Sequence, residues 1–195
     1  MYKNMVDYFD DKEIEIGDFK LSKFKIEKDN FRARMDGISC GDYVRLTQKD
    51  DVVMSDTDME KETNSKFVRN AHGDVLIAGL GIGLIVLPIQ DKEEVNSITI
   101  IEMNQEVIDL VTPQLPLNSK VRIIKADIFK WKPEQGTRYD VIYFDIWNYI
   151  NTDIYQEEMK PLKNRFKNYL RARVDNPNRF MKCWVEHEAK NNIRI

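Results

Sequence analysis

The sequence has few cysteines and no long apolar run. Its only cysteines, Cys40 and Cys183, form no Cys-x-x-Cys unit. Two isolated cysteines cannot build a dense disulfide framework, so we expect free thiols in a reducing compartment. No apolar stretch approaches the roughly 20 residues that a membrane helix needs, and the first ten residues lack the charged-then-apolar layout of a signal peptide. These absences predict a cytoplasmic protein without membrane association.

An excess of positive charge is also missing. The chain has 30 Lys and Arg against 33 Asp and Glu, a formal net charge of −3 at pH 7. Such a balance predicts no overall attraction to nucleic acid. The chain has only two histidines, and no set of residues with metal-ligand spacing is visible, so we expect no metal. The length of 195 residues is enough for one domain with a real core, with room for a small appended lobe.

The C-terminal segment is a local exception in charge. Residues 160–195 contain ten Lys or Arg against three acidic residues. Four of them form a basic stripe beside an apolar helical face: Lys160, Lys163, Lys167 and Arg171. Such a stripe is most often a solvated face, and a nucleic-acid contact is the weaker alternative.

The first part of the chain has the alternation of antiparallel strands. Apolar residues occupy alternate positions in 19–21, 24–26 and 31–35, and short apolar runs follow at 43–46 and 52–54. Turn-forming residues separate these runs. Residues 1–55 are therefore predicted to form a small lobe of β-hairpins.

From residue 56 onward, strand and helix patterns alternate. Thr57 and Glu60 fit a capping box, which predicts a helix from there to about Ala71. Predicted strands at 75–78, 98–101, 121–124 and 141–144 then alternate with helices at 84–90, 106–115 and within 153–173. This order is typical of parallel strands joined by crossover helices. We therefore predict an α/β fold for 56–195, an open Rossmann-like and mainly parallel sheet with flanking helices.

The most informative stretch is the apolar run that begins at Val75 and leads into Gly79, Gly81 and Gly83. Glycines after a buried strand let the backbone approach a ligand closely, and the following helix offers free N–H groups. This predicts a nucleotide-type cofactor site. A dinucleotide loop would need its third glycine at the position of Leu84, so the pattern argues against NAD.

Three acids follow at the ends of successive predicted strands, where open α/β sheets bind ligands. Glu102 could accept both hydroxyls of a ribose. Asp127 could accept from an adenine amino group while Ile128 or Phe129 packs on the ring. Asp145 would point into the same crevice. Taken singly, each acid could instead be a solvated strand end, a helix cap or a turn residue.

With these motifs in order, residues 51–147 resemble class I S-adenosylmethionine-dependent methyltransferases, and within them the spermidine-synthase-like branch. The resemblance is carried by VLIAGLGIG at 75–83, IIEMN at 100–104, ADIF at 126–129 and YDVIYFD at 139–145. Ile77 stands where many class I enzymes have an acid. Aminopropyltransferases also tend to have an apolar residue at this position. The N-terminal hairpin lobe and the segment 54–60 favour the same branch.

The resemblance implies a cofactor, a reaction class and a set of residues. The cofactor would be S-adenosylmethionine, its decarboxylated form or a close analogue. The reaction would be methyl or aminopropyl transfer to an unknown small-molecule acceptor. Asp145 would be catalytic, orienting an acceptor amine or removing its proton, and Trp147 and Tyr149 could wall the pocket. The implied cofactor-binding residues are Gly79, Leu80, Gly81, Gly83, Glu102, Met103, Asp127, Ile128 and Asp145.

The sequence also departs from this family. A full class I sheet has seven strands, yet after Asp145 only one helix and one strand, at 180–186, are predicted, so the family's last helix and final two strands lack counterparts. The residues that follow Asp145 are neither acid-rich nor proline-rich. The alternative is therefore a catalytically degenerate binding or assembly module. A strand left exposed at the sheet edge would be covered by self-association or by the N-terminal hairpins.

Overall fold

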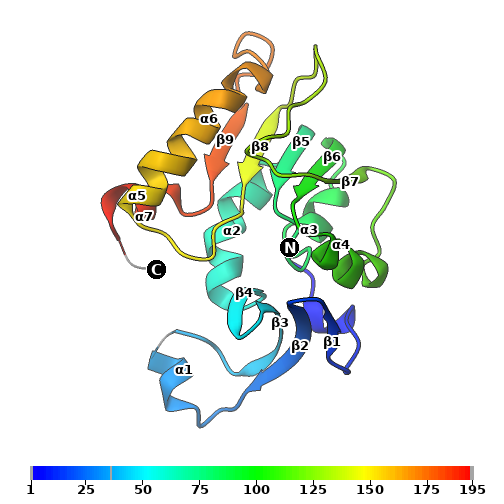
Figure 1. The fold of residues 1–195 in the computed structure, drawn as a ribbon, viewed down its shortest axis with the longest axis vertical. Coiled ribbons are helices and arrows are strands. Elements are labelled where there is room, and N and C mark those ends of the chain that lie inside the picture. Colours follow the sequence, from blue (N-terminus) through cyan, green and yellow to red (C-terminus); the bar gives the residue numbers. More distant parts are fainter. Residues whose placement is uncertain (1, 36, 194–195) are drawn as a thin grey trace.

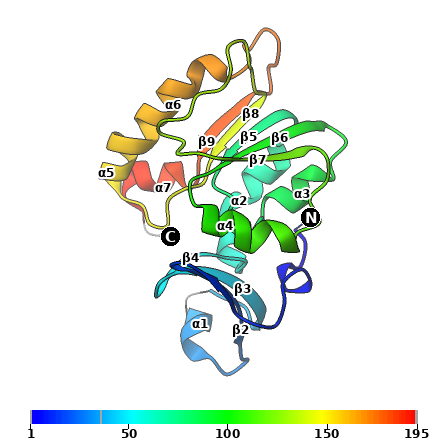
Figure 2. The ribbon, with the colours of Figure 1, turned by 45° about the vertical axis from the view of Figure 1, so that its right-hand side comes forward.

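The computed structural model describes residues 2–35 and 37–193 and contains two sheets (Figures 1 and 2). The N-terminal sheet is antiparallel with strand order β1-β2-β3-β4. Its strands are β1 (Ile14–Ile16), β2 (Phe19–Ile26), β3 (Gly41–Gln48) and β4 (Asp51–Ser55). This confirms the antiparallel lobe expected from the alternation.

One predicted strand of the lobe is wrong. Residues 31–35 form the short helix α1 (Phe31–Met35) in the connection between β2 and β3. The side chain of Asn30 accepts a hydrogen bond from the N–H of Ala33 at 3.0 Å, which favours a helical turn. Only Ala33 of this helix is buried, whereas Phe31 is 73% exposed. The alternating apolar residues therefore do not mark a buried sheet face.

The second sheet is entirely parallel and has strand order β7-β6-β5-β8-β9. Its strands are β5 (Gly73–Ala78), β6 (Val95–Glu102), β7 (Val121–Lys125), β8 (Val141–Phe144) and β9 (Phe180–Cys183). Helices α3 (Val86–Gln90) and α4 (Gln105–Val111) lie in the first two crossovers. The predicted open Rossmann-like sheet with flanking helices is thus confirmed, with five strands in the described ranges.

Helix α2 (Asp58–Asn70) connects the two sheets (Figure 1). Thr57 is its N-cap residue, but the Thr57 side chain does not cap the helix. Its hydroxyl instead lies 3.1 Å from that of Ser55. The predicted capping box is therefore wrong, and Glu60 lines a cavity instead.

The helical region after β8 is less regular than predicted. It consists of α5 (Thr152–Ile154), a π-helical turn (Tyr155–Met159), α6 (Lys160–Phe166) and a 3-10 turn (Lys167–Tyr169). Pro161 is near the start of α6, which follows the π-helical turn directly. Of the predicted apolar face, Met159, Leu162 and Phe166 are buried, whereas Tyr155 and Tyr169 are half-buried.

The C-terminal segment begins with β9, which pairs with β8 alone. The strand ends at Cys183 rather than near residue 186, because Val185 adopts a left-handed conformation (φ 40°) before α7 (Glu186–Asn191). The hairpin lobe forms no strand pairing with β9 within the described ranges. The lobe therefore does not cover this edge by strand pairing.

The two sheets share one core. A single cluster of buried apolar side chains includes Met5, Leu21 and Leu46 from the N-terminal part together with Phe67 and Val75 from the α/β part. A second cluster lies between the parallel sheet and α6. Among the described helices, none is both long enough and apolar enough to span a membrane.

Candidate functional site

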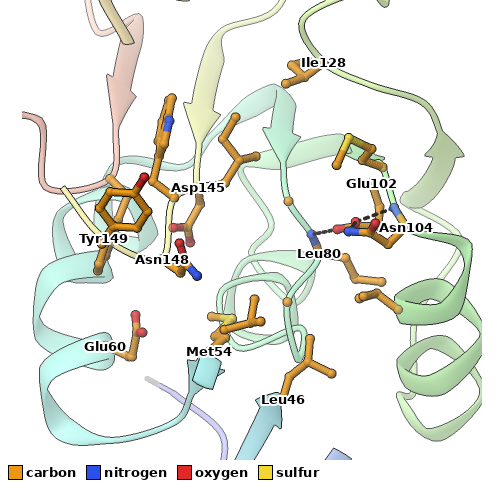
Figure 3. Close-up of a pocket in the computed structure, with 18 of the residues that line it drawn as sticks. Leu46, Met54, Glu60, Leu80, Glu102, Asn104, Ile128, Asp145, Asn148 and Tyr149 are labelled. Carbon is orange, nitrogen blue, oxygen red and sulfur yellow. Dashed lines mark hydrogen bonds between the residues drawn. The ribbon is translucent and has the colours of Figure 1, made fainter. Parts of the chain in front are cut away.

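A cavity of about 740 Å³ lies between the carboxyl ends of the parallel strands and the hairpin lobe (Figure 3). Most of the residues predicted from the sequence line it together: Gly79, Leu80, Gly81, Glu102, Met103, Asp127, Ile128 and Asp145. The lobe contributes further walls through Phe19, Leu46 and residues 52–55. The structure therefore brings together in one site residues that are widely separated along the chain.

The glycine loop is held between two neighbouring segments. Gly79 and Gly81 have positive φ values of 97° and 51°, a conformation that costs side-chain-bearing residues energy. A Cβ atom at Gly79 would collide with the backbone oxygen of Asp145, and one at Gly81 would collide with the sulfur of Met54. Both glycines are thus required by close contacts as well as by conformation.

Gly83 differs from the other two glycines. It also has a positive φ, of 77°, but a Cβ atom there would collide with the side chain of Leu115. Gly83 is not among the residues that line the cavity, and its carbonyl accepts from the N–H of Val86 at 3.0 Å, at the start of α3. The geometry gives this glycine a packing role outside the cavity.

Glu102 ends β6 and is 7% exposed. Its Oε2 accepts from the backbone N–H of Leu80 at 2.9 Å, and its Oε1 accepts from the backbone N–H of Asn104 at 2.8 Å (Figure 3). The carboxylate therefore fastens the glycine loop to the end of the neighbouring strand. The side-chain amide of Asn104 also donates to Oε1, at 3.3 Å, so the free lone pair for a ligand is on Oε2.

The turn after β7 places an acid and two apolar side chains in the cavity wall. Asp127 accepts from the backbone N–H of Phe129 at 2.9 Å through Oδ1, and its Oδ2 lies 3.2 Å from Nζ of Lys130. Ile128 is buried, whereas Phe129 is 42% exposed. The acid thus shapes its own turn and still faces the site.

Asp145 follows β8, and its backbone N–H donates to the carbonyl of Ala78 at 2.8 Å. Burial raises the pKa of its carboxyl from 3.8 to about 7. Glu60 lies on α2 and faces the same cavity; burial, with a smaller contribution from the Asp145 charge, raises its pKa from 4.5 to about 8. Two carboxyl groups of this cavity are therefore poised to exchange protons near neutral pH.

The sequence analysis missed Glu60 as a site residue because its spacing from Thr57 matched a capping signal. It also missed Glu158, which lies in the π-helical turn and accepts from the indole N–H of Trp147 at 2.7 Å. This bond ties the loop after β8 to the following helical segment. Trp147 and Tyr149 both line the cavity, as the sequence suggested.

The charge of the cavity is one-sided. Among the described residues that line it there is no Lys, Arg or His, whereas five carboxyl side chains are present: Glu60, Glu102, Asp127, Asp145 and Glu158. Low-dielectric walls strengthen the field of like charges in a cleft. The site is therefore electrostatically suited to a positively charged ligand. No group of acidic, histidine or cysteine residues suited to hold a metal ion occurs within the described ranges.

The basic stripe of the C-terminal segment is partly consumed by internal ion pairs. Lys163 lies 2.5 Å from a carboxylate oxygen of Glu186. Arg171 contacts Asp140 at 2.7 Å and Asp74 at 3.1 Å, at the opposite end of the strands from the cavity. Half of the stripe therefore stabilises the fold, which leaves little support for a nucleic-acid surface.

Comparisons with known proteins find similarity only among solved structures. No protein-family model matches the chain, and no curated protein matches its sequence. The chain is similar to the N-methyltransferase NodS from Bradyrhizobium japonicum in complex with S-adenosyl-L-homocysteine, with 15% identity and a TM-score of 0.47. That alignment covers 60% of this chain and 59% of NodS.

Two further solved structures show a comparable degree of similarity. The plantazolicin methyltransferase BpumL, in complex with a monoazolic desmethylPZN analog and SAH, has 18% identity and a TM-score of 0.41. The alignment covers 58% of this chain and 46% of BpumL. An S-adenosylmethionine-dependent methyltransferase from Clostridium acetobutylicum has 20% identity, a TM-score of 0.41 and coverage of 60% and 48%. The matches thus span about half of the solved chains.

Proposed function

We propose that this chain binds S-adenosylmethionine or its decarboxylated analogue and transfers a methyl or aminopropyl group to a small-molecule acceptor. The observation that carries the proposal is that five carboxyl groups line one cavity together with the glycine loop, and that no described lining residue is basic. A sulfonium ligand is a cation, so it matches this field. The cavity volume of about 740 Å³ also lies in the range of small-molecule sites.

The cofactor would extend across the strand ends. Its aminoacyl or aminopropyl end would lie against Gly79 and Gly81, whose exposed backbone permits close approach. A ribose hydroxyl would donate to Oε2 of Glu102, which accepts a single hydrogen bond from the chain. The adenine would lie by Asp127 with Ile128 against the ring. This placement uses each acid for a separate part of the ligand.

Transfer requires little of the protein beyond alignment, because a bound sulfonium cofactor supplies an alkyl group that is already activated. Asp145 lies at the end of β8 beside the glycine loop, within reach of a group bound between the two sheets. With its pKa raised to about 7, it can accept a proton from an acceptor near neutral pH. The walls formed by Trp147 and Tyr149 would help to exclude water.

Isothermal titration calorimetry with S-adenosylmethionine and decarboxylated S-adenosylmethionine tests the binding. We expect the wild type to bind one or both, and Glu102→Ala to weaken binding by at least about tenfold, because charge-assisted hydrogen bonds are lost. Glu157→Ala is the matched control, because this exposed glutamate lies outside the cavity. Absence of binding of either compound by the wild type would overturn the proposal.

A cofactor-binding module without turnover is the second candidate. It is favoured by the fact that Glu102 and Asp127 already bind backbone N–H groups, so the crevice is held in shape without a ligand. Incubation with each cofactor and panels of polyamines, small amines and nucleic acids separates the two candidates. Binding without transfer to any acceptor favours the module, whereas an alkylated product detected by mass spectrometry favours the transferase.

A further inference from the structure

A second cavity, of about 470 Å³, lies on the face of the parallel sheet that carries α6. Its lining residues come from the start of β5, from β6 and β7, and from the connection between β7 and β8 at residues 126–140. Helix α6 lies nearer to β8 and β9 than to β7 (Figures 1 and 2), so it leaves this part of the sheet free. None of the lining residues belongs to the cavity at the carboxyl ends of the strands, so the two cavities are separate.

The floor of the second cavity is polar. Ser97, Thr99 and Ile101 occupy alternate positions of β6 and therefore share one face. Ile101 packs in the core cluster beneath α6, and Arg122 is paired in register with Thr99, so it lies on the same face. Parallel sheets that are covered on both faces have apolar strands, whereas the connection at 126–140 contains no helix that could cover β7. Strands β6 and β7 therefore present polar groups to a cavity and not to a core.

The connection that walls the second cavity is anchored at both ends. The backbone N–H of Trp131 donates to the carbonyl of Asp127 at 2.7 Å, and the indole ring stacks on Phe166 with ring centroids 6.4 Å apart. At the other end, the backbone N–H of Tyr139 donates to the carbonyl of Tyr169 at 2.8 Å, and Tyr139 itself is buried. The cavity is therefore enclosed between a sheet and a segment that is fixed in place, as a binding site requires.

Three basic side chains line the second cavity: Arg122, Lys132 and Arg138. Within residues 2–35 and 37–193, none of them makes an ion pair. Arg138 donates to the carbonyl of Thr137 at 2.8 Å, which is a neutral acceptor and leaves the charge uncompensated. Burial raises the pKa of the Tyr139 hydroxyl, and the charge of Arg122 acts in the opposite sense, which places this guanidinium near the buried wall. The cavity thus has three cations without counter-ions.

The two acids of the second cavity do not balance these charges. Asp74 is already engaged, because its carboxylate lies 3.1 Å from a guanidinium nitrogen of Arg171 and accepts from the hydroxyl of Ser97 at 2.7 Å. Glu134 is exposed and makes no ion pair within the described ranges. Three cations therefore face one free acid. The cavity at the strand ends has the reverse character, since its charged side chains are all carboxyl groups.

We propose that the second cavity binds a small phosphate-bearing anion, held by Arg122, Lys132 and Arg138. Guanidinium and ammonium groups form strong, charge-assisted hydrogen bonds with phosphate oxygens. The hydroxyls of Thr99 and Thr137 supply further donors, and a cleft with an excess of one charge concentrates its field on an entering anion. The volume lies within the range of small-molecule sites. This inference does not depend on the proposed transferase function, because no residue of the other cavity takes part.

Calorimetric titration of the complete chain with pyrophosphate, at constant ionic strength, tests the site. We expect the wild type to bind pyrophosphate, and Arg122→Gln and Lys132→Gln each to weaken binding by at least about fivefold, because each loses a charge-assisted contact. Arg32→Gln is the matched control, because this exposed arginine of α1 lies outside both cavities. No binding by the wild type, or equal binding by the wild type and Arg122→Gln, would overturn the proposal. Equal losses in Arg122→Gln and Arg32→Gln would also overturn it.

Glu134→Gln provides a readout that loss of structure would not produce. This substitution removes the one free acid of the second cavity, so pyrophosphate should bind about two- to fivefold more tightly than to the wild type. The same titration measures the change, and circular dichroism checks that all variants are folded. Unchanged or weaker binding would contradict a site governed by the charges of these residues.

Nucleic acids carry the same phosphate chemistry, so a short single-stranded oligonucleotide is titrated in parallel. We expect it to bind less tightly than pyrophosphate, because the cavity has the size of a small-molecule site and the chain has a net charge of −3. Tighter binding of the oligonucleotide, lost in Arg122→Gln, would make this face a nucleic-acid contact and overturn the proposal of a small anion.

Discussion

At the scale of single residues, the site depends on carboxyl groups that are partly shielded from water. Glu60 and Asp145 are both protonated in the folded chain at a pH where they would be ionised in an unfolded one, since their pKa values are raised to about 8 and about 7. A carboxyl group with a raised pKa stabilises the folded state at low pH and loses that contribution as the pH rises. The two carboxyl groups therefore make the folded chain less stable at neutral pH than at acidic pH.

The resulting prediction concerns the pH dependence of stability. Between about pH 4 and pH 8 the free energy of unfolding should fall, because the unfolded chain loses these two protons at lower pH than the folded chain does. The melting temperature should decline by about 3 °C for each kcal/mol lost in a domain of this size. Glu60→Gln, which cannot ionise, should flatten this decline when thermal unfolding is followed by circular dichroism. A slope unchanged from that of the wild type would count against the raised pKa of Glu60.

Some residues of the site could be predicted from the sequence, and others could not. Gly79, Gly81, Glu102 and Asp145 were predictable because strand ends of a parallel sheet meet at one edge, so spacing along the chain implies proximity. Glu60 was not predictable in this way. Its position in the cavity depends on how the lobe and α2 pack over the sheet, and its spacing from Thr57 matched a local signal that the side chains do not use.

At the scale of elements, the segment after β8 is the most irregular part of the site. The bond from Trp147 to Glu158 at 2.7 Å joins the loop at residues 145–150 to the π-helical turn. Such π-turns are rare and are frequent at functional sites. The periodicity of apolar residues predicted a helix here and its buried face, but it could not reveal a change of helical type, because that type is a property of the backbone hydrogen bonds and not of side-chain spacing.

Replacing Trp147 by Phe should loosen that segment. The substitution keeps an aromatic ring but removes the N–H donor, which contributes about 1.5–3 kcal/mol when it binds a charged acceptor. We expect faster amide exchange across residues 145–150, several-fold weaker binding of cofactor and a melting temperature lowered by several degrees. Hydrogen-exchange mass spectrometry measures the first effect and calorimetry the second. Trp131→Phe, outside the cavity, is the control; equal exchange in all three proteins would contradict the prediction.

Elements also differed in how well local patterns predicted them. The parallel strands were predicted within a few residues because buried, β-branched runs have few other interpretations. The helix at 31–35 was read as a strand, since five residues with apolar positions at 31, 33 and 35 fit period two equally well. The deciding contact there is the bond from Asn30 to Ala33, which alternation does not encode.

At the scale of the whole molecule, β7 and β9 are the edges of the parallel sheet within the described ranges. Unpaired edges are sites of association unless they are protected. We predict that the chain self-associates, and light scattering at increasing concentration measures this. Charge introduced on β9, as in Met181→Lys, should then shift the population to the monomer. A wild type that remains monomeric at every concentration would contradict the prediction.

The contact between Met54 and Gly81 joins β4 of the lobe directly to the glycine loop. The boundary predicted near residue 55 therefore divides the chain into two parts but does not divide the cavity, which both parts line. Expression of the α/β part alone would open the cavity on one side and expose core side chains that the lobe now covers. Substitutions at residues 52–54 therefore change the surroundings of a bound ligand as directly as substitutions in the glycine loop do, so the two parts are expected to evolve as one unit.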